Sequence, residues 1–476
     1  MSDFYVSPLV QRFATDPMKR LWSAQKKFST WRRCWIALAE AEQELGLDIT
    51  DAQIEEMRAQ VDNIDFVQAA AYEKETRHDV MAHIHAFGDV APQARAIIHL
   101  GATSCFVGDN TDLILIREGL ELILAKAAGV LNRLKAFAWE YRHLPTLGFT
   151  HYQPAQLVTV GKRACLWAQD LLLDCLQLES LLASMRCRGV KGATGTQASF
   201  QALFQGDTEK IKALDQLVAK KLGFESSFII ASQTYTRKID TQVLNVLAGI
   251  GESAHKFGTD MRLLQNLKEV EEPFERSQVG SSAMPYKRNP MRSERICALS
   301  RFLMTTPLHS SFTTATQWFE RTLDDSAIRR LSLPEAFLAA DAILNLYLNV
   351  MEAPRVYPKV IEKRIWSELP FMASENILMA CVQKGGDRQH LHEIIRQHAQ
   401  EAGRMVKEEG ADNDLLDRLA ADPEINMTRE EMNELLQLEA FVGRAPAQVE
   451  EFITGEVDPF LARHAQGLDT RSDVHI

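Results

Sequence analysis

The chain of 476 residues carries 53 Lys and Arg against 64 Asp and Glu, a formal net charge of -11, and 46% of its residues are hydrophobic. Its length suggests about three domains, and its apolar content is sufficient for a large buried core. The acidic balance argues against a nucleic-acid or membrane-surface binder, because either would need a basic face. Any anionic ligand must therefore meet a local basic pocket.

The seven cysteines include no CxxC pair, and several lie within apolar helical patterns. This usage is typical of reduced thiols in a cytosolic protein, rather than of a zinc ribbon or a disulfide framework. The N-terminal stretch has no long apolar core, and no segment reaches the ~18 apolar residues of a membrane span. We therefore expect a soluble cytoplasmic protein.

Helical periodicity dominates the chain, and strand-like alternation is scarce. Helices look short up to about residue 103, and short and charge-rich after about 357. Longer patterns between them predict helices at 111–143, 159–189, 234–273, 290–304 and 333–351. The first three exceed the usual ~8–20 residues, so several neighbouring helices, including those of other subunits, must bury their apolar faces. We expect an all-α protein with an N-terminal domain (1–103), a central long-helix bundle (104–356) and a C-terminal cap (357–476).

The first candidate site is the segment RHDVMAHIH, from Arg77 to His85. His78 and His85 are seven residues apart and would share a helical face, whereas His83 lies off that face. A metal site would need a pattern such as HExxH or a cysteine partner, which the segment lacks. The pattern favours an Arg-His-Asp cluster, completed by Asp79, that binds a phosphate or carboxylate. A solvated helix face is the alternative.

Two further segments place polar side chains beside long helices. GATSCFVGDNTD contributes the hydroxyl groups of Thr103 and Ser104 ahead of the helix predicted from 111. In LGFTHYQPAQ, His151 precedes Pro154, and the extended backbone ahead of proline would fix it in a loop at the mouth of the next helix. A structural histidine is the alternative to a catalytic one.

The segment GSSAMPYKRNP, at 280–290, carries more chemistry than a connector needs. Asn289 is a preferred helix cap and Pro290 suits the first helical position, so a helix is expected to begin here. Its positive end would face Lys287 and Ser281. The pattern predicts an anion-stabilising loop that can move, with a flexible surface connector as the alternative.

The segment FERTLDDSAIRR places Arg321 just ahead of a helical stretch. Ser326 and Arg330 follow on one helical face, four residues apart. Two arginines beside a serine suit phosphate recognition. Salt bridges from the arginines to Asp324 and Asp325 are the alternative.

At GSSAMPYKRNP the chain resembles the fumarase/aspartase superfamily, whose signature loop has the pattern Gly-Ser-Ser-x-Met-Pro-x-Lys-x-Asn-Pro. Further segments are similar to those of adenylosuccinate lyases of the branch that includes the vertebrate enzymes: RHDVMAH, GATSCFVGDNTDL, LGFTHYQPAQ, KGATGTQASF, QTYTRK and QWFERTLDDSAIRR. The resemblance spans nearly the whole chain and fades only at its two ends.

The resemblance implies a three-domain, all-α homotetramer whose central helices form a twenty-helix bundle, with each active site built from three subunits. It implies a cofactor-free β-elimination that releases fumarate in two steps of purine biosynthesis. One step converts adenylosuccinate to AMP, and the other converts succinylaminoimidazole-carboxamide ribotide to aminoimidazole-carboxamide ribotide. Small molecules are the expected ligands, with neither metal, nucleic acid nor membrane.

The resemblance also assigns roles to residues. Ser281 matches the general base, His151 the general acid, and Glu294 the carboxylate that orients the histidine. Lys287 matches a loop residue that contacts the substrate. Phe13 stands where the family often has tyrosine, so any hydroxyl contact at that position is lost. The other substrate-binding matches are Arg12, Arg77, His78, Asp79, Thr103, Ser104, Gln233, Asn289, Arg295, Arg321, Ser326 and Arg330.

Elimination must remove a very weakly acidic proton beside a carboxylate, and donors placed where charge develops on that carboxylate do most of the catalytic work. Lys287, Asn289 and a helix N-terminus would supply these donors, and the positive surroundings would activate Ser281. His151 would protonate the departing nitrogen. The five arginines would offset the substrate's phosphate and carboxylates.

Two rival interpretations remain. Another superfamily member, such as argininosuccinate lyase, would share the signature loop but lack the group of Arg321, Ser326 and Arg330. A non-catalytic, crystallin-like structural protein would not need the intact catalytic residues.

Overall fold

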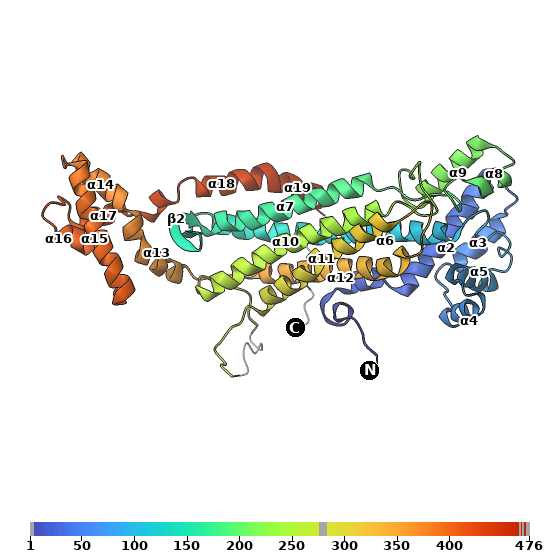
Figure 1. Ribbon diagram of the computed structural model, residues 1–476, viewed down its shortest axis with the longest axis horizontal. Helices are drawn as coiled ribbons and strands as arrows, with labels where there is room; N and C mark the ends of the chain where they lie inside the picture. Colours follow the sequence, from blue (N-terminus) through green and yellow to red (C-terminus); the bar gives the residue numbers. More distant parts are fainter. Residues whose placement is uncertain (1–3, 276–282, 466–467, 469–470, 473–476) are drawn as a thin grey trace.

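The computed structural model describes the whole chain except residues 1–3, 276–282, 466–467, 469–470 and 473–476. Five of the described helices run lengthwise through the molecule and make up a central bundle (Figure 1). Their apolar faces bury one continuous hydrophobic core, and the expected all-α long-helix architecture is confirmed. The helices are α6 (Ser104–Glu140), α7 (Val160–Ser184), α10 (Lys238–Asn266), α11 (Met291–Thr316) and α12 (Asp325–Glu352).

Helix α6 begins at Ser104, and the prediction that it starts at Thr111 is wrong. The polar residues ahead of Thr111 have tertiary partners instead. Asn110 Nδ2 donates to the carbonyl oxygens of Phe106 at 2.9 Å and Gly189 at 3.2 Å, and its Oδ1 accepts from the Gly189 N–H at 3.0 Å. Because these side chains are satisfied inside the protein, the helix continues through a sequence that looks like a cap.

Helices α11 and α12 each contain a proline and extend beyond their predicted limits. Helix α11 passes Met304 and continues through Pro307. Proline removes the amide that would bond the Leu303 carbonyl, and Thr306 Oγ1 donates to that oxygen at 2.8 Å instead. Helix α12 likewise passes through Pro334. Helices α7 and α10 are shorter than predicted, although Thr159 does cap α7 by accepting from the Lys162 N–H at 3.1 Å.

Helix α12 is the one described helix that could span a membrane by length and composition. The sequence predicts no such span. Of the apolar window in this helix, 83% is buried within the protein. Packing in the bundle therefore accounts for its apolar sequence.

Shorter helices form a second hydrophobic core at one end of the bundle (Figure 1). Segments far apart in sequence meet there, since α9 packs against α2. The helices at this end are α2 (Ala24–Glu44), α3 (Asp51–Ala59), α4 (Phe66–Thr76), α5 (Asp79–Val90), α8 (Ala198–Leu203) and α9 (Thr208–Lys221). The short helix α1 (Asp16–Leu21) packs against α6 and α12, and its Met18 and Leu21 belong to the bundle core.

The opposite end carries a cap of short helices (Figure 1): α13 (Pro358–Met372), α14 (Ser374–Gln383), α15 (Arg388–Glu408), α16 (Leu415–Ala421) and α17 (Arg429–Leu435). The chain then returns along the bundle as α18 (Ala445–Phe452) and α19 (Asp458–Arg463), where Arg463 pairs with Glu179 of α7 at 3.0 Å. Helices α6 and α13 begin next to the predicted boundaries at 103/104 and 356/357. The division into three domains stays a prediction.

The described strands are short. Strands β1 (Pro145–Thr150) and β2 (Gln153–Thr159) form an antiparallel hairpin between α6 and α7, with Thr150 paired to Gln153. Strands β3 (Val270–Glu271) and β4 (Arg355–Val356) form a two-residue ladder beside the end of α10. The two ladders are linked through Glu269, whose carboxylate accepts from Thr146 Oγ1 at 3.4 Å and from Arg364 Nε at 2.8 Å.

Candidate functional site

Four predicted site residues meet where α5, α6 and α12 begin, and we call them the junction group: His78, Asp79, Ser104 and Arg330. His78 Nε2 lies 3.1 Å from Ser104 Oγ, and Arg330 Nη2 lies 3.3 Å from Asp79 Oδ2. Arg330 is 62% exposed, so its guanidinium remains accessible to an anion. The group combines a cation, an imidazole and a hydroxyl at one surface, as an anion-binding site needs.

The histidines of the RHDVMAHIH segment lie in different environments. His78 is the N-cap of α5 and accepts from the Met81 N–H, so the prediction that it shares a helical face with His85 is wrong. His83 is buried and stacks on Phe28 with ring centroids 3.7 Å apart. Burial lowers the pKa of His83 to about 4, so it is a neutral core residue. Among the described residues no cluster of His, Cys, Asp or Glu suits a metal ion.

Beneath the junction group lies a buried ionic network that holds Arg321. Arg321 Nη1 bonds both carboxylate oxygens of Asp325, at 2.9 and 3.0 Å. Arg237 Nε bonds the same carboxylate at 2.7 Å, and its Nη1 bonds Asp109 Oδ2 at 3.0 Å. Burial opposes the ionised form of Asp109, but Arg237 and Arg329 hold its pKa below the ordinary value. The salt bridge from Arg321 to Asp325, considered above as an alternative, therefore exists. The same network fixes the Arg321 side chain near the junction group.

The other predicted residues of this end are neighbours of the junction group in sequence, except Gln233, which contacts Cys105. Thr103 is the N-cap of α6, and Arg77 ends α4 in a left-handed conformation with φ 55°. Ser326 lies in the first turn of α12, four residues before Arg330 as predicted. Gln233 accepts at Oε1 from Cys105 Sγ, 3.7 Å away, and its backbone N–H bonds the Glu320 carbonyl at 3.1 Å.

A second set of predicted residues lies at the start of α11, and we call it the helix-start group: Arg12, Phe13, Lys287, Asn289, Glu294 and Arg295. The Arg295 guanidinium lies 5.4 Å above the centre of the Phe13 ring. Burial, and then the positive charge of Arg12, lower the pKa of Arg295. Phe13 thus contacts a predicted substrate-binding arginine, a role that does not need the tyrosine hydroxyl.

The start of α11 differs from the prediction. The helix begins at Met291, with Pro290 in the N-cap position, so Asn289 is not the cap. The first amides are bonded to a buried carboxylate instead, because Glu272 accepts from the N–H groups of Arg292 and Ser293, each at 3.0 Å. These donors are not directed at a substrate, and the prediction that the positive helix end faces the signature loop must be corrected. Arg12, Lys287 and Arg295 remain as cations of this group.

His151 lies in the turn of the β1–β2 hairpin. His151 and Tyr152 form the two-residue turn with φ 53° and 58°, which is the backbone that matches the twist of a hairpin. The predicted extended backbone is therefore found at Gln153, the residue directly before Pro154, and not at His151. His151 is exposed at the end of the hairpin.

Within one chain, the predicted site residues that the structure describes do not converge on one place. The junction group and the helix-start group lie at opposite ends of α11, whose 26 residues span about 39 Å. Within the described chain no hydrogen bond joins His151 to Glu294, its predicted partner. Ser281, the predicted general base, lies outside the described residues. One chain therefore presents three separate parts of the predicted site (Figure 1).

Comparisons with known proteins identify the chain. Residues 11–304 match the Lyase family, and residues 370–452 match the adenylosuccinate lyase C-terminus family. The adenylosuccinate lyase of Saccharomyces cerevisiae is 54% identical over 96% of this chain and 95% of its own length. That of Schistosoma mansoni is 49% identical over 99% of both chains. This chain belongs to the adenylosuccinate lyase family.

Solved structures confirm the superfamily fold for this lyase. A fumarate lyase from Mesorhizobium sp. BNC1 superposes with a TM-score of 0.78 at 24% identity, covering 93% of this chain and 99% of that chain. The 3-carboxy-cis,cis-muconate lactonizing enzyme from Pseudomonas putida gives a TM-score of 0.80 at 22% identity, covering 96% and 99%. At this identity the likeness concerns the fold.

The structure also places a cation that sequence reasoning did not single out, Lys27, within electrostatic range of Asp79 and Arg330. Lys27 of α2 lies 5.2 Å from the ring centres of Phe28 and Trp31. Burial lowers the pKa of Lys27, while Asp112 and Asp79 act against that effect. Lys27 thus lies beside the junction group, where it interacts electrostatically with Asp79 and Arg330. Its place on an ordinary amphipathic helix gave no signal in the sequence.

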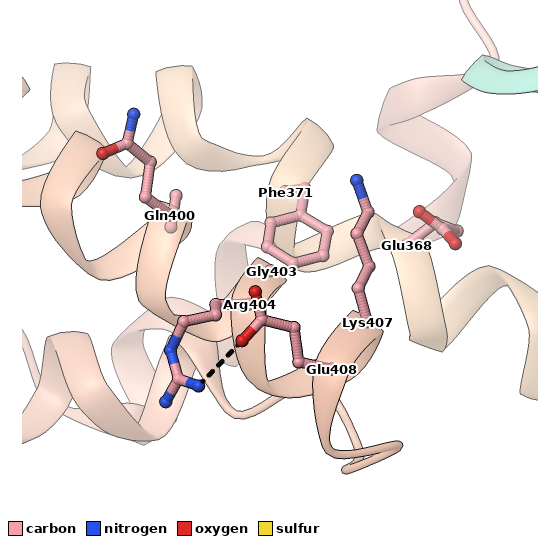
Figure 2. Close-up of a pocket in the computed structure, with 8 residues that line it drawn as sticks. Glu368, Phe371, Gln400, Gly403, Arg404, Lys407 and Glu408 are labelled. Carbon is pink, nitrogen blue, oxygen red and sulfur yellow. Dashed lines mark hydrogen bonds and ion pairs between the residues drawn. The ribbon is translucent and has the colours of Figure 1, made fainter.

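A cavity of about 470 Å³ lies elsewhere, between α13 and α15 of the C-terminal cap (Figure 2). Phe371, Gly403 and Lys407 line it, and Arg404 pairs with Glu408 at 3.2 Å on one side. It contains no residue of the predicted site.

Proposed function

We propose that this chain catalyses the cofactor-free β-elimination of fumarate from two purine precursors. Adenylosuccinate would give AMP, and succinylaminoimidazole-carboxamide ribotide would give aminoimidazole-carboxamide ribotide. The observation that carries the proposal is the near full-length identity of 54% to a yeast adenylosuccinate lyase. The intact signature segment and two cation-containing groups at either end of α11 support it.

Each group of residues has a task in this reaction. Arg330, with His78 and Ser104, suits the substrate's phosphate or a carboxylate, because these side chains offer charge-assisted hydrogen bonds at an exposed surface. Lys287 and Arg295 would stabilise the negative charge that develops when the proton beside the carboxylate leaves. Ser281 would remove that proton, and His151 would protonate the departing nitrogen.

The active form would be a homotetramer in which three subunits build each site. Two observations support this. The parts of the site lie about a helix length apart in one chain, too far for one substrate to bridge. Apolar side chains of the long helices are also exposed in the single chain, and they need partners: Leu166, Leu173, Leu176, Phe302, Leu308, Phe312 and Leu331. We further propose that the protein works in the cytoplasm.

The reaction is tested by following absorbance as purified protein consumes adenylosuccinate, with argininosuccinate as the matched control substrate. We expect turnover of the first and none of the second. Turnover of argininosuccinate alone would assign a different lyase activity. Absence of turnover with adenylosuccinate and with argininosuccinate, in a folded tetramer, would favour a structural role.

Shared sites are tested by mixing two inactive variants. His151→Ala and Ser281→Ala are dissociated together and allowed to reassemble. If the two residues of one site come from different subunits, random equal mixing leaves about a quarter of the sites intact, so about a quarter of wild-type activity should return. Activity that stays at the level of the separate variants, despite mixed tetramers, would show that both residues come from one chain.

A further inference from the structure

We call residues 271–275, which lead into the signature segment, its first end, and residues 288–293, which lead out of it, its second end; contacts between these residues form a neck. We propose that Glu272, a residue outside the predicted site, is a positioning residue for the reaction. Its carboxylate would fix the start of α11 and so the placement of Lys287, Glu294 and Arg295. The proposal rests on the proposed function, since it concerns the same site.

Glu272 is buried, with 3% of its surface exposed, and one carboxylate serves three donors. Oε1 accepts from the Arg292 N–H at 3.0 Å. Oε2 accepts from the Ser293 N–H at 3.0 Å and from Ser293 Oγ at 2.9 Å. Arg292 and Ser293 are themselves buried, at 1% and 0% exposure. Without the carboxylate, two buried N–H groups and a hydroxyl would lose their acceptor, and a buried donor left unpaired is destabilising.

Further contacts tie the segment's second end to the same neck. Arg288 Nη1 pairs with Glu271 Oε2 at 3.1 Å, and Tyr357 Oη donates to the same oxygen at 2.7 Å. Gln265 at the end of α10 donates to the Arg288 carbonyl at 2.9 Å, and its Oε1 accepts from the Glu272 N–H at 3.4 Å. The position of residue 288 is thus determined by Glu271 of β3 and by Gln265, which also bonds the backbone of Glu272.

Arg292 connects back to the first end of the segment. Its Nη1 donates to the Pro273 carbonyl, and Nη2 pairs with Glu275 Oε1 at 3.1 Å. Glu272 therefore bonds the backbone of the same residue whose side chain holds the first end. Since Lys287 lies one residue before Arg288, and Glu294 and Arg295 directly follow Ser293, a shift of the helix start would move all three site residues together.

The carboxylate also has an electrostatic effect. A helix N-terminus carries a partial positive charge, and an anion there is stabilising. Glu272 supplies that anion from inside the protein, so the charge that meets the substrate must come from Lys287 and the arginines. A neutral residue at 272 would change both the geometry and the field of the site.

The test compares Glu272→Gln with Asp174→Asn. Asp174 is also buried and accepts from Ser253 Oγ at 2.6 Å, but it lies in α7 away from the neck, so it controls for the loss of a buried carboxylate. We expect Glu272→Gln to lower kcat at least tenfold, to change KM by less than about threefold, and to accelerate amide hydrogen exchange only around 288–296. Asp174→Asn should keep kcat within twofold.

A second variant keeps the test decisive if Glu272→Gln folds poorly. Ser293→Ala removes one of the three donors and should lower kcat by a few fold. If both act through the same contact, the double variant should be no worse than Glu272→Gln alone. Wild-type kcat in Glu272→Gln, or a loss matched by faster exchange throughout the bundle, would overturn the proposal. An inactive wild-type protein would instead overturn the proposed function.

Discussion

Glu42 offers a test of how burial controls charge in the N-terminal core. This α2 residue is fully buried, and neither carboxylate oxygen accepts a hydrogen bond from any described residue. Burial raises the pKa of Glu42 to about 9. The folded protein therefore keeps this proton at pH 7, although an unfolded chain releases it near pH 4.5.

The sign of the pH effect follows from proton binding. Between about pH 4.5 and 9 the folded state holds a proton on Glu42 that the unfolded state lacks, so stability falls as pH rises. The slope approaches 1.4 kcal/mol per pH unit, or on the order of 4 kcal/mol between pH 5 and pH 8. Replacing Glu42 with glutamine, which is neutral and similar in shape, removes this contribution.

The assay is the melting temperature of Glu42→Gln and wild type at equal protein concentration from pH 5 to pH 8. With an unfolding entropy of about 2.1 cal/mol/K per residue, 1 kcal/mol corresponds to roughly 1 °C in a chain of this length. The variant should gain roughly 3–4 °C relative to wild type over this range. Glu44→Gln is the control, because Glu44 is half exposed beside Lys221 at 2.7 Å. A melting difference independent of pH would mean that Glu42 is ionised in the folded protein.

Two further substitutions separate binding from structure. Arg321→Ala should raise KM about tenfold or more, since a charged hydrogen bond contributes about 1.5–3 kcal/mol, and the melting temperature should change little because Asp325 keeps Arg237 at 2.7 Å. An unchanged KM with a large loss of melting temperature would make Arg321 purely structural. Phe13→Leu removes the ring below Arg295 and should raise KM roughly two- to fivefold, as loss of about 0.5–1 kcal/mol predicts, whereas Phe13→Tyr should match wild type. Equal KM values for Phe13→Leu and wild type would refute the role of the ring.

The sequence by itself determined the long-helix architecture and the family. Apolar periodicity over tens of residues is a local property, and it identified all five bundle helices, although their ends shifted. The signature segment and the motifs around His78, His151 and Arg321 are also local, and they led to the family that the comparisons confirm. The catalytic roles assigned to these residues remain predictions.

Only the tertiary structure decided which polar residues are bonded inside the protein. In sequence, Asn289 looks like a cap, and Asn110 lies where a helix was expected to begin. In the folded chain, Glu272 bonds the start of α11, and Asn110 bonds Gly189 across the core. Likewise His83 is neutral because Phe28 and its neighbours bury it. The partner that satisfies a polar group can lie anywhere in the chain, so hydrogen bonding and burial, and with them charge, follow from packing rather than from neighbouring residues.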